Sequence, residues 1–519
     1  MSIDTQPTDS NGAHGGAGLY LAVLGMMLAL YAVTTQHGPA WQDSGIFQWR
    51  ILNFDLAGEL GLALAHPLLI MLGKAMSFLP FGSPAFRMNL LSAVCGAVAT
   101  ANVALLVRRL SPDRPVAAWL AAGFFGLAHT PWWLSTICES QMVFAALFTL
   151  ELHVLVSLVR RPTGGLVLLL GVVNGLTLMA HNLALLSMAV YGLAVLAFCL
   201  RGKLRWFAVG LLAIGWVAGS AGLLALVARE AGAIGLIPAI KSALFGQRWQ
   251  GDVLGGSARA VRMGAAYIVY NFPNVALPLA AVGLWRFCRG PLKAFRWPIC
   301  GLTALYLGFA IRYTVVDQFM FFVPFYAMLA VLAGVGLGSL RDRTFSWLAP
   351  LAMASLLTGP VLYAAMPSVA RLANLPVPGR SDLPFRDAGR YWLSPWKAGE
   401  NSAGLFASKA LASVPVGGIV IADSTSLPPL RWIQRVDGLG RGVKLLTGAS
   451  PEMVPPGAPN VFAVSAIPGY YPSWLAKAAL LERSPGQALY SVTWRKSGGP
   501  PDDRPGERVP GPATVPSRL

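Results

Sequence analysis

The chain is predicted to be a polytopic α-helical membrane protein with about eleven spans and a small C-terminal α/β domain. Two observations lead to this fold class. Of the 519 residues, 55% are hydrophobic and only 12% are charged, whereas about a quarter of the residues in a soluble domain are charged. The apolar residues also form blocks of about 20 residues, the length of one helical membrane crossing, and short basic clusters separate many of them.

The apolar blocks predict the spans in chain order. The first, residues 17–35, lacks a small-residue cleavage site and is interpreted as an anchor rather than a signal peptide. Further spans are expected at residues 88–107, 116–128, 134–159, 165–179, 183–200, 206–227, 264–284, 298–311, 319–340 and 345–366. A Gly-rich loop of about 35 residues is expected between the spans 206–227 and 264–284.

The distribution of Lys and Arg predicts the orientation. With the N-terminus in the cytoplasm, every second junction is cytoplasmic, and these junctions are the basic ones: 108–114, 160–161, 201–205, 286–296 and 341–343. The net charge of +18 is therefore attributed to membrane topology rather than to nucleic-acid binding. An odd number of spans places the C-terminal domain outside, in the cell inner membrane or its equivalent.

The expected domain organisation follows from these spans. Residues 1–16 are predicted to be disordered, 17–366 to form the membrane domain with residues 41–87 as its first exoplasmic loop, 367–496 to form an exoplasmic α/β domain, and 497–519 to be a Pro/Gly-rich disordered tail. In the α/β domain, strands are expected at 418–423, 443–446, 461–464 and 489–494, and helices at 401–412, 429–436 and 474–481. The five cysteines have no paired metal-binding spacing.

The first loop, residues 41–87, is too polar to cross a bilayer and too apolar to be freely solvated, so we expect interfacial helices. Asp43, after Gln42, could deprotonate an acceptor hydroxyl or help to hold a metal near a phosphate, or it could simply begin a helix. His66 could bind a phosphate or act as an acid or base, or it could cap a helix that starts at Pro67.

Other ionisable residues lie close to membrane depth, where they require a partner or a function. Glu139 lies one turn into a span, whereas Glu151 and His153 could pair with neighbouring helices. His181 and Asn182 interrupt a long apolar run, either as functional groups or as a tight turn. Arg312 could hold a phosphate through paired donors, or form a surface ion pair with Asp317.

Together these residues resemble the C-type (GT-C) glycosyltransferase superfamily, and most of all its transmembrane protein O-mannosyltransferase-like branch, formerly of unknown function. The resemblance is carried by Gln42-Asp43-Ser44-Gly45, Ala65-His66-Pro67, Phe86-Arg87-Met88-Asn89-Leu90-Leu91-Ser92, Glu139 after Trp132-Trp133, and Ala180-His181-Asn182. Arg390-Tyr391-Trp392 and Ile421-Ala422-Asp423 also look like family positions. Unlike many members, the chain has Leu68 after Pro67 and Ile46 after Asp-Ser-Gly.

The resemblance implies transfer of a mannose-like hexose from a polyprenyl- or dolichyl-phosphate donor to a hydroxyl of a protein, glycan or lipid on the exoplasmic face. Asp43 would be the general base or a metal-linked carboxylate, and Glu139 the second acidic residue. His66 and His181 would face the lipid phosphate, and we add Arg312 by inference. No cofactor is certain, and a divalent metal stays open.

Two other classes of function are also consistent with the sequence. In a transporter or lipid flippase, Glu139, Glu151 and His181 would line a pathway, and broken helices and inverted repeats would be expected. In a non-enzymatic assembly subunit, the membrane domain would only display the C-terminal domain. No ATP-binding, nucleophile-elbow or zinc-protease motif appears in the sequence.

Overall fold

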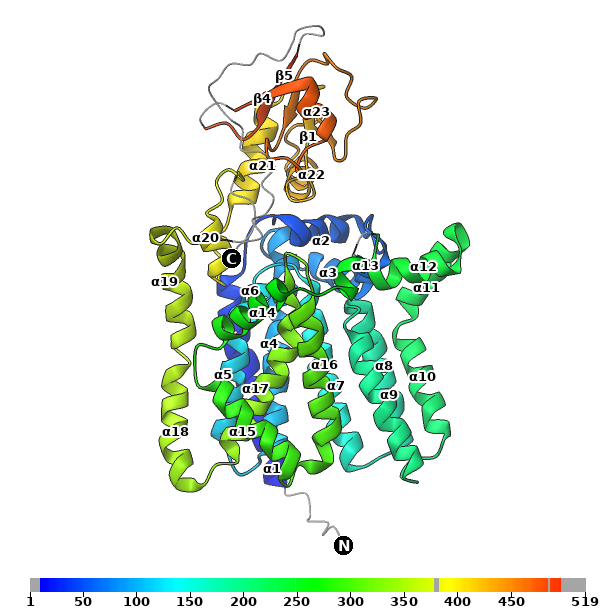
Figure 1. Ribbon diagram of the computed structural model, residues 1–519, viewed down its shortest axis with the longest axis vertical. Coiled ribbons are helices and arrows are strands. Elements are labelled where there is room, and N and C mark those ends of the chain that lie inside the picture. The colour runs from blue at the N-terminus through cyan, green and yellow to red at the C-terminus, as the bar shows by residue number, and fades with distance from the viewer. Residues whose placement is uncertain (1–9, 248, 378–381, 484–485, 496–519) are drawn as a thin grey trace. The chain divides into compact units, whose positions relative to one another are not determined.

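The computed structural model describes residues 10–247, 249–377, 382–483 and 486–495 (Figure 1). The described chain divides into two compact units. The first contains residues 10–37, 50–377 and 387–400, and the second contains residues 38–49, 382–386 and the described residues from 401 onwards. Residues 1–9 and 496–519, which cover most of the predicted disordered ends, lie outside the described residues, and the first helix already begins at Ser10.

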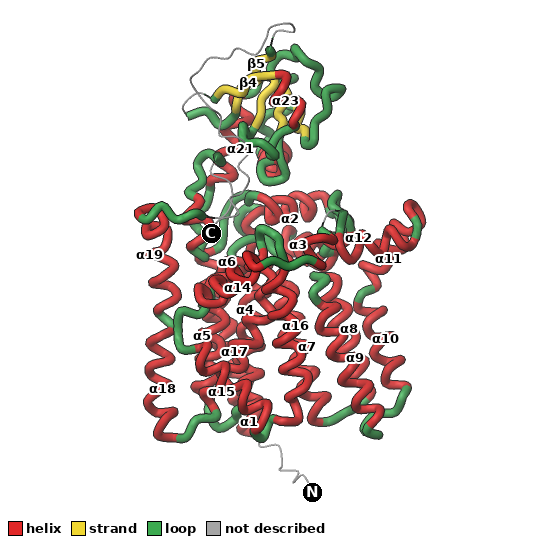
Figure 2. The backbone as a smooth tube through the Cα atoms, in the orientation of Figure 1, coloured by secondary structure: helices red, strands yellow, loops and turns green. Residues whose placement is uncertain are grey.

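The first unit is a bundle of apolar helices (Figure 2). Within the described residues, six helical segments are long and apolar enough to cross a membrane. They are Gly16–Thr34 of α1 (Ser10–Thr34), α4 (Pro84–Leu110), α7 (Ser140–Arg160), Lys293–Arg312 with α16 (Arg296–Arg312), Gln318–Gly338 with α17 (Val323–Gly338), and Asp342–Leu372 with α18 (Asp342–Ser355) and α19 (Thr358–Leu372).

Two predicted spans each coincide with a bent pair of helices. The span expected at 206–227 consists of α10 (Phe207–Gly219) and α11 (Ala221–Ile234), bent by 74°. The span expected at 264–284 consists of α14 (Ala258–Asn271) and α15 (Ala276–Arg289), bent by 102°. Pro273 lies in this second break and cannot continue a helical hydrogen-bond ladder. Counting each bent pair as one span raises the number of candidate spans to eight among the described residues.

Shorter apolar helices occupy the remaining predicted spans. They are α5 (Pro115–Gly126), α8 (Gly164–Ala180) and α9 (Ala184–Leu200). Helices α8 and α10 pack with their backbones in contact, because a Cβ added to Gly219 would lie only 2.1 Å from the Val172 oxygen. Such small-residue contacts are typical of membrane helices. The total of about eleven spans stays a prediction.

The long loop predicted between residues 227 and 264 is largely helical, which corrects that prediction. It contains the end of α11, α12 (Leu236–Phe245), α13 (Gln250–Leu254) and the start of α14. The glycines Gly235, Gly246 and Gly255 lie at the helix boundaries. These glycines lie where one short helix ends and the next begins, so the region is not a flexible linker.

The second unit contains a five-stranded mixed sheet of order β2-β1-β3-β5-β4. Strands β1 (Ile419–Ile421), β2 (Lys444–Leu446) and β3 (Val461–Ala463) are parallel, while β5 (Tyr490–Trp494) is antiparallel to β3 and to β4 (Ala479–Glu482). Helices α21 (Ser402–Ser413) and α22 (Leu427–Val436) agree with the predictions. The helix predicted at 474–481 ends early, because α23 (Ser473–Ala478) gives way to β4, which pairs with β5.

Besides residues 367–377, one further segment of the range predicted as the C-terminal domain belongs to the first unit. This segment, residues 387–400, contains α20 (Ala388–Leu393). The Trp133 indole N–H donates to the Tyr391 carbonyl at 2.9 Å, and the Lys397 backbone N–H donates to the Thr34 carbonyl at 2.7 Å. The buried Lys397 ammonium also donates to the carbonyls of Tyr391 and Ser394, at the end of α20.

Candidate functional site

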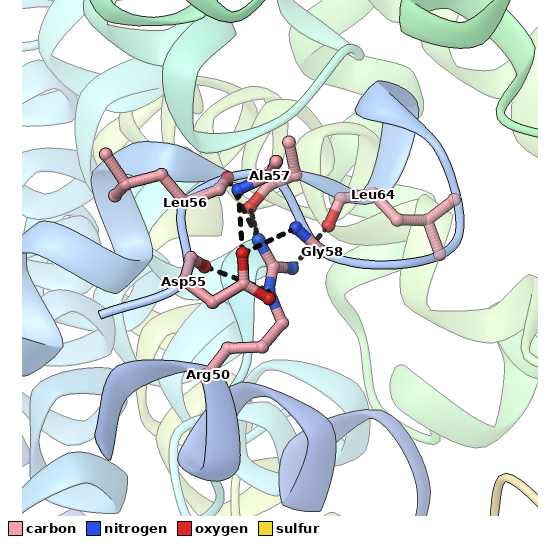
Figure 3. Close-up of polar contacts among 7 residues, drawn as sticks. Arg50, Asp55, Leu56, Ala57, Gly58 and Leu64 are labelled. Atoms are coloured by element: carbon pink, nitrogen blue, oxygen red, sulfur yellow. Dashed lines mark hydrogen bonds and ion pairs between the residues drawn. The ribbon is translucent and has the colours of Figure 1, made fainter. Parts of the chain in front are cut away.

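The first loop is closed around the buried side chain of Arg50, near the end of α2 (Gln42–Asn53) (Figure 3). Its Nε donates to the Asp55 carbonyl at 3.1 Å, and Nη1 donates to the Leu64 carbonyl at 2.8 Å. Its Nη2 donates to the carbonyls of Leu56, at 3.0 Å, and Ala65, at 2.6 Å. One guanidinium therefore holds both ends of the loop between residues 55 and 65, the rigid fork geometry for which arginine is suited.

Hydrogen bonds within the turn and a glycine also stabilise this loop. The Asp55 carboxylate accepts the backbone N–H groups of Ala57 and Gly58, at 3.2 and 3.0 Å. Gly58 has φ +72°, and a Cβ there would lie 3.0 Å from the Arg50 guanidinium carbon. Only glycine adopts this backbone without strain and leaves room for the guanidinium.

The Arg50 loop ends at His66, the residue before α3 (Pro67–Ser77). His66 has φ 44° and ψ 52°, a left-handed conformation that is uncommon for a residue with a side chain. Its buried imidazole stacks on that of His181, with ring centroids 5.0 Å apart and planes inclined by 23°. The structure therefore brings together His66 and His181, the two residues that the resemblance places against the lipid phosphate.

Burial is the main reason that both imidazoles are neutral. It lowers the pKa of His181 to about 4. Burial also lowers the pKa of His66 well below its ordinary value, and proximity to the ionisable groups of His181 and Arg50 lowers it further, while the hydrogen bond to the Ala180 backbone acts in the opposite direction. Neutral imidazoles each have one N–H donor and one acceptor nitrogen.

The surroundings of His181 fix its tautomer. The Leu183 backbone N–H donates to Nδ1 of His181 at 3.1 Å, so the neutral ring carries its proton on Nε2. Phe144 and Phe321 contact the ring edge-on at 6.1 and 5.7 Å. The pair thus offers an N–H donor in largely apolar surroundings, where an anionic oxygen would be bound strongly.

Asn182 ties this site to α12. Its amide donates to the Ala243 carbonyl at 2.6 Å. On the same helix, the Ser242 hydroxyl accepts the Leu62 backbone N–H at 3.0 Å, from the short 3-10 helix Leu62–Leu64 that precedes His66. Asn182 therefore has a structural role that connects the two histidine-bearing segments through one helix.

Glu139 is buried at the start of α7, as the residue before its first turn. The Ser92 hydroxyl of α4 accepts its backbone N–H at 3.0 Å. Phe144, which contacts His181, lies five residues further along α7, or about 8 Å of helix rise. Glu139 therefore lies at the end of α7 that also meets the histidine pair.

Asp43 belongs to the second unit, in the first turn of α2, and its side chain is half-buried. Burial raises the pKa of its carboxyl group. Gln42, directly before it, has φ 55° and donates its backbone N–H to the Thr425 carbonyl at 3.2 Å. The segment that carries Asp43 is therefore held in an unusual backbone conformation.

Arg312 lies at the end of α16, and Asp317 follows it, half-buried, before a 3-10 helix at Gln318–Phe322. The Arg312 guanidinium donates to the carbonyls of Val253, Leu254 and Gly255, at 3.1, 3.0 and 3.2 Å. These carbonyls end α13, so the structure places Arg312 as a helix C-terminal cap. From the sequence, a phosphate or Asp317 was expected as the partner of Arg312. The helix cap was not predicted.

Glu151 and His153 pair with neighbouring helices, one of the two interpretations given above. Glu151 accepts hydrogen bonds from Asn174, Thr177, Ser187 and Tyr191, on α8 and α9. The His153 ring contacts Asn102 and Arg109 on α4. Arg50 is not among the residues predicted from the sequence, and the signal for it is an arginine inside an interfacial apolar stretch.

No group of three or more His, Cys, Asp or Glu side chains that could hold a metal ion occurs in the described part of the chain. The two histidines at the site have no third ligand of these types beside them there.

The fold defines an integral multi-pass membrane protein whose helical bundle buries polar side chains. No protein-family model matches the chain. The chain is similar to the crystal structure of ArnT from Cupriavidus metallidurans bound to undecaprenyl phosphate, with TM-score 0.52 and 15% identity over 82% of this chain and 85% of that one. This similarity shows a GT-C-like fold, as the sequence predicted.

A second similar structure is the Archaeoglobus fulgidus oligosaccharyltransferase in complex with Zn and sulfate. Its TM-score is 0.45 and its identity 17%, over 83% of this chain and 62% of that chain.

Proposed function

We propose that this protein is a membrane glycosyltransferase that uses a polyprenyl- or dolichyl-phosphate-linked sugar. The observation that carries the proposal is the stacked pair of His66 and His181, which offers a buried N–H donor beside the first loop of a GT-C-like bundle. Undecaprenyl phosphate is the molecule bound to ArnT, which has the same fold. A mannose-like hexose is the proposed sugar, and a hydroxyl of a protein, glycan or lipid is the proposed acceptor.

In the proposed reaction, the acceptor oxygen attacks the anomeric carbon and the bond from that carbon to the phosphate oxygen breaks. Asp43 accepts the hydroxyl proton, and its raised pKa makes it a stronger base than an exposed aspartate. The His181 Nε2–H and the His66 ring face the departing lipid phosphate and stabilise its negative charge. Glu139 is the second acidic residue of the proposed site.

The proposed reaction takes place on the extracytoplasmic face, with the N-terminus in the cytoplasm. The ends of α4 and α7 that lie opposite Glu139 are basic, and the Arg160 guanidinium donates there to the Arg109 carbonyl at 2.7 Å. Positive charge favours the cytoplasmic side of a membrane protein. The end that carries the histidine pair is then the outer one.

A transporter or lipid flippase is the second candidate function. The two broken helix pairs, α10–α11 and α14–α15, favour it, because discontinuous helices are common in transporters. The carboxylate of Glu151 is held by four side-chain donors, which suits a structural role better than a transport pathway.

The test compares wild type with Asp43→Asn and His181→Asn in proteoliposomes that contain a radiolabelled polyprenyl-phosphate hexose and are supplied with a hydroxyl-bearing acceptor. We expect wild type to release polyprenyl phosphate and form a glycoside. Asp43→Asn is expected to lose about 100-fold or more in turnover with donor binding retained. His181→Asn is expected to weaken donor binding. Translocation of the labelled lipid without glycoside formation would assign the transporter function instead.

A further inference from the structure

The beginning of the first loop, residues 38–49, belongs to the second unit, which contains the C-terminal α/β domain. Residues 38–49 belong to the same compact unit as residues 401 onwards, although more than 350 residues separate them in sequence. Trp41, two residues before Asp43, is fully buried there. Its indole N–H donates to the Ser402 hydroxyl at 2.8 Å, and its ring packs against Phe406 with centroids 5.1 Å apart. Both partners lie on α21.

A second set of contacts holds the other side of Asp43. The Gln42 backbone N–H donates to the Thr425 carbonyl, just before α22. A Cβ added to Gly45 would lie 2.9 Å from the Pro428 Cβ and 2.3 Å from the Ala40 oxygen, so only glycine fits between them. The Arg431 guanidinium lies 5.7 Å from the Trp49 ring centroid. Asp43 is thus flanked on both sides by residues that the C-terminal domain holds.

A hydrogen bond within residues 38–49 also restrains this segment. The Gln48 side-chain oxygen accepts the Ala40 backbone N–H at 2.9 Å. Thus Trp41, Gly45 and the backbone of Gln42 are each fixed, while the Asp43 carboxyl group stays half-exposed. Such an arrangement removes conformational freedom from the segment and leaves the functional group accessible.

We propose that the C-terminal α/β domain is a positioning domain for Asp43, with Trp41 and Gly45 as the positioning residues. The catalytic consequence rests on the proposed function, whereas the anchoring of residues 38–49 does not. A carboxylate that removes a proton from an acceptor requires placement to within about 1 Å, and a displacement of that size can cost about 100-fold in rate. Contact with a folded domain supplies this placement more reliably than a free loop.

The test uses Trp41→Phe, Ser402→Ala and Gly45→Ala in the full-length protein, with Val454→Ala as the control. Val454 is buried in the core of the same domain with Ile421, Val461 and Leu475, so the control weakens the domain without touching residues 38–49. Hydrogen–deuterium exchange of peptides that cover residues 40–49 measures the anchoring. Turnover and the donor KM measure its catalytic consequence.

We expect about 10-fold faster exchange of the Gln42 amide in Trp41→Phe and Ser402→Ala, because each removes the buried hydrogen bond between Trp41 and Ser402. Turnover is expected to fall about 10-fold or more, while the donor KM changes less than about twofold, because His66 and His181 belong to the other unit. Val454→Ala is expected to lower the unfolding temperature of the domain and to leave both quantities near wild type.

Unchanged exchange of residues 40–49 in both Trp41→Phe and Ser402→Ala would overturn the proposal, and so would faster exchange with unchanged turnover. If Gly45→Ala does not fold, these two milder variants still decide the question. The activity of Asp43→Asn tests the proposed function separately, because the exchange measurement does not depend on any transfer reaction.

Discussion

The imidazole of His66 lies against that of His181, with ring centroids 5.0 Å apart, although one comes from the first loop and the other from the turn between α8 and α9. Two protonated rings at this distance would repel each other, and Arg50 adds a third positive charge nearby. A neutral pair beside an arginine is therefore prepared for an anion rather than for a cation. The predictions below follow from this arrangement and from the residues that hold it.

The first prediction concerns the acid stability of the protein. Burial lowers the pKa of His181 to about 4, whereas an unfolded histidine has a pKa of about 6.5. The unfolded chain thus binds more protons between these two values, so stability is complete above about pH 6.5 and falls as the pH approaches 4, by up to about 3 kcal/mol from this residue. Thermal unfolding in detergent from pH 7.5 to 4.5 measures the loss.

The matched variant is His181→Asn, which cannot take up the proton. Its unfolding temperature should depend less steeply on pH across the same window, and the remaining slope should come from other buried histidines such as His66. An identical slope in wild type and in the variant would contradict the assignment of a neutral, buried His181.

The second prediction separates the backbone of His66 from its side chain. Its φ of 44° costs a residue with a Cβ about 1 kcal/mol relative to glycine. His66→Gly should therefore be more stable than His66→Ala by about that amount, while both should bind the lipid donor more weakly. Chemical denaturation and donor-binding titrations check the two parts independently. Equal stability of the two variants would mean that the left-handed backbone is not retained.

The third prediction concerns Arg50 and the loop that it closes. Lysine has one nitrogen and cannot reach the carbonyls of residues 55, 56, 64 and 65 together, so Arg50→Lys should release the loop almost as fully as Arg50→Gln. We expect a stability loss of about 2–4 kcal/mol and about 10-fold faster cleavage after the exposed Glu59 by a glutamate-specific protease.

Lys74→Gln is the control for this experiment. The Lys74 ammonium donates to the Leu52 carbonyl at 3.1 Å, outside the loop that Arg50 holds, so cleavage after Glu59 should stay at the wild-type rate. Protection of Glu59 that persists in Arg50→Lys would show that charge alone, rather than the fork of donors, keeps the loop closed.

The fourth prediction distinguishes two roles for Arg312. Its three hydrogen bonds to the end of α13 favour a cap, so Arg312→Gln should lower the stability by about 1–3 kcal/mol and change the donor KM less than about twofold. Steady-state kinetics and thermal unfolding are the measurements. A large rise in the donor KM at unchanged stability would instead support the phosphate-binding role that the sequence pattern suggested.

The pattern of apolar residues along the chain explains which parts of the fold can be predicted from the sequence. Apolar blocks of span length locate the long apolar helices, because lipid forces each crossing segment to be apolar and internally hydrogen-bonded, whereas α12 and α13 lie in a region predicted as a loop. The breaks inside the predicted spans 206–227 and 264–284 were missed, because hydropathy averages over a Pro or a small-residue contact. Strand β4 was missed because an apolar run of a few residues fits a helix and a strand equally well until β5 pairs with it.

By itself, the sequence determined the membrane class, the positions of most long apolar helices and of strands β1, β2, β3 and β5, and the residue types worth testing as a site. Only the tertiary structure decided which of those residues meet. It stacked His66 on His181, assigned Arg312 to a helix end, and placed the segment of Asp43 in the C-terminal unit. The physical reason is that periodicity and composition report the local environment, whereas these contacts join segments far apart along the chain, whose pairing is set by the packing of the whole fold.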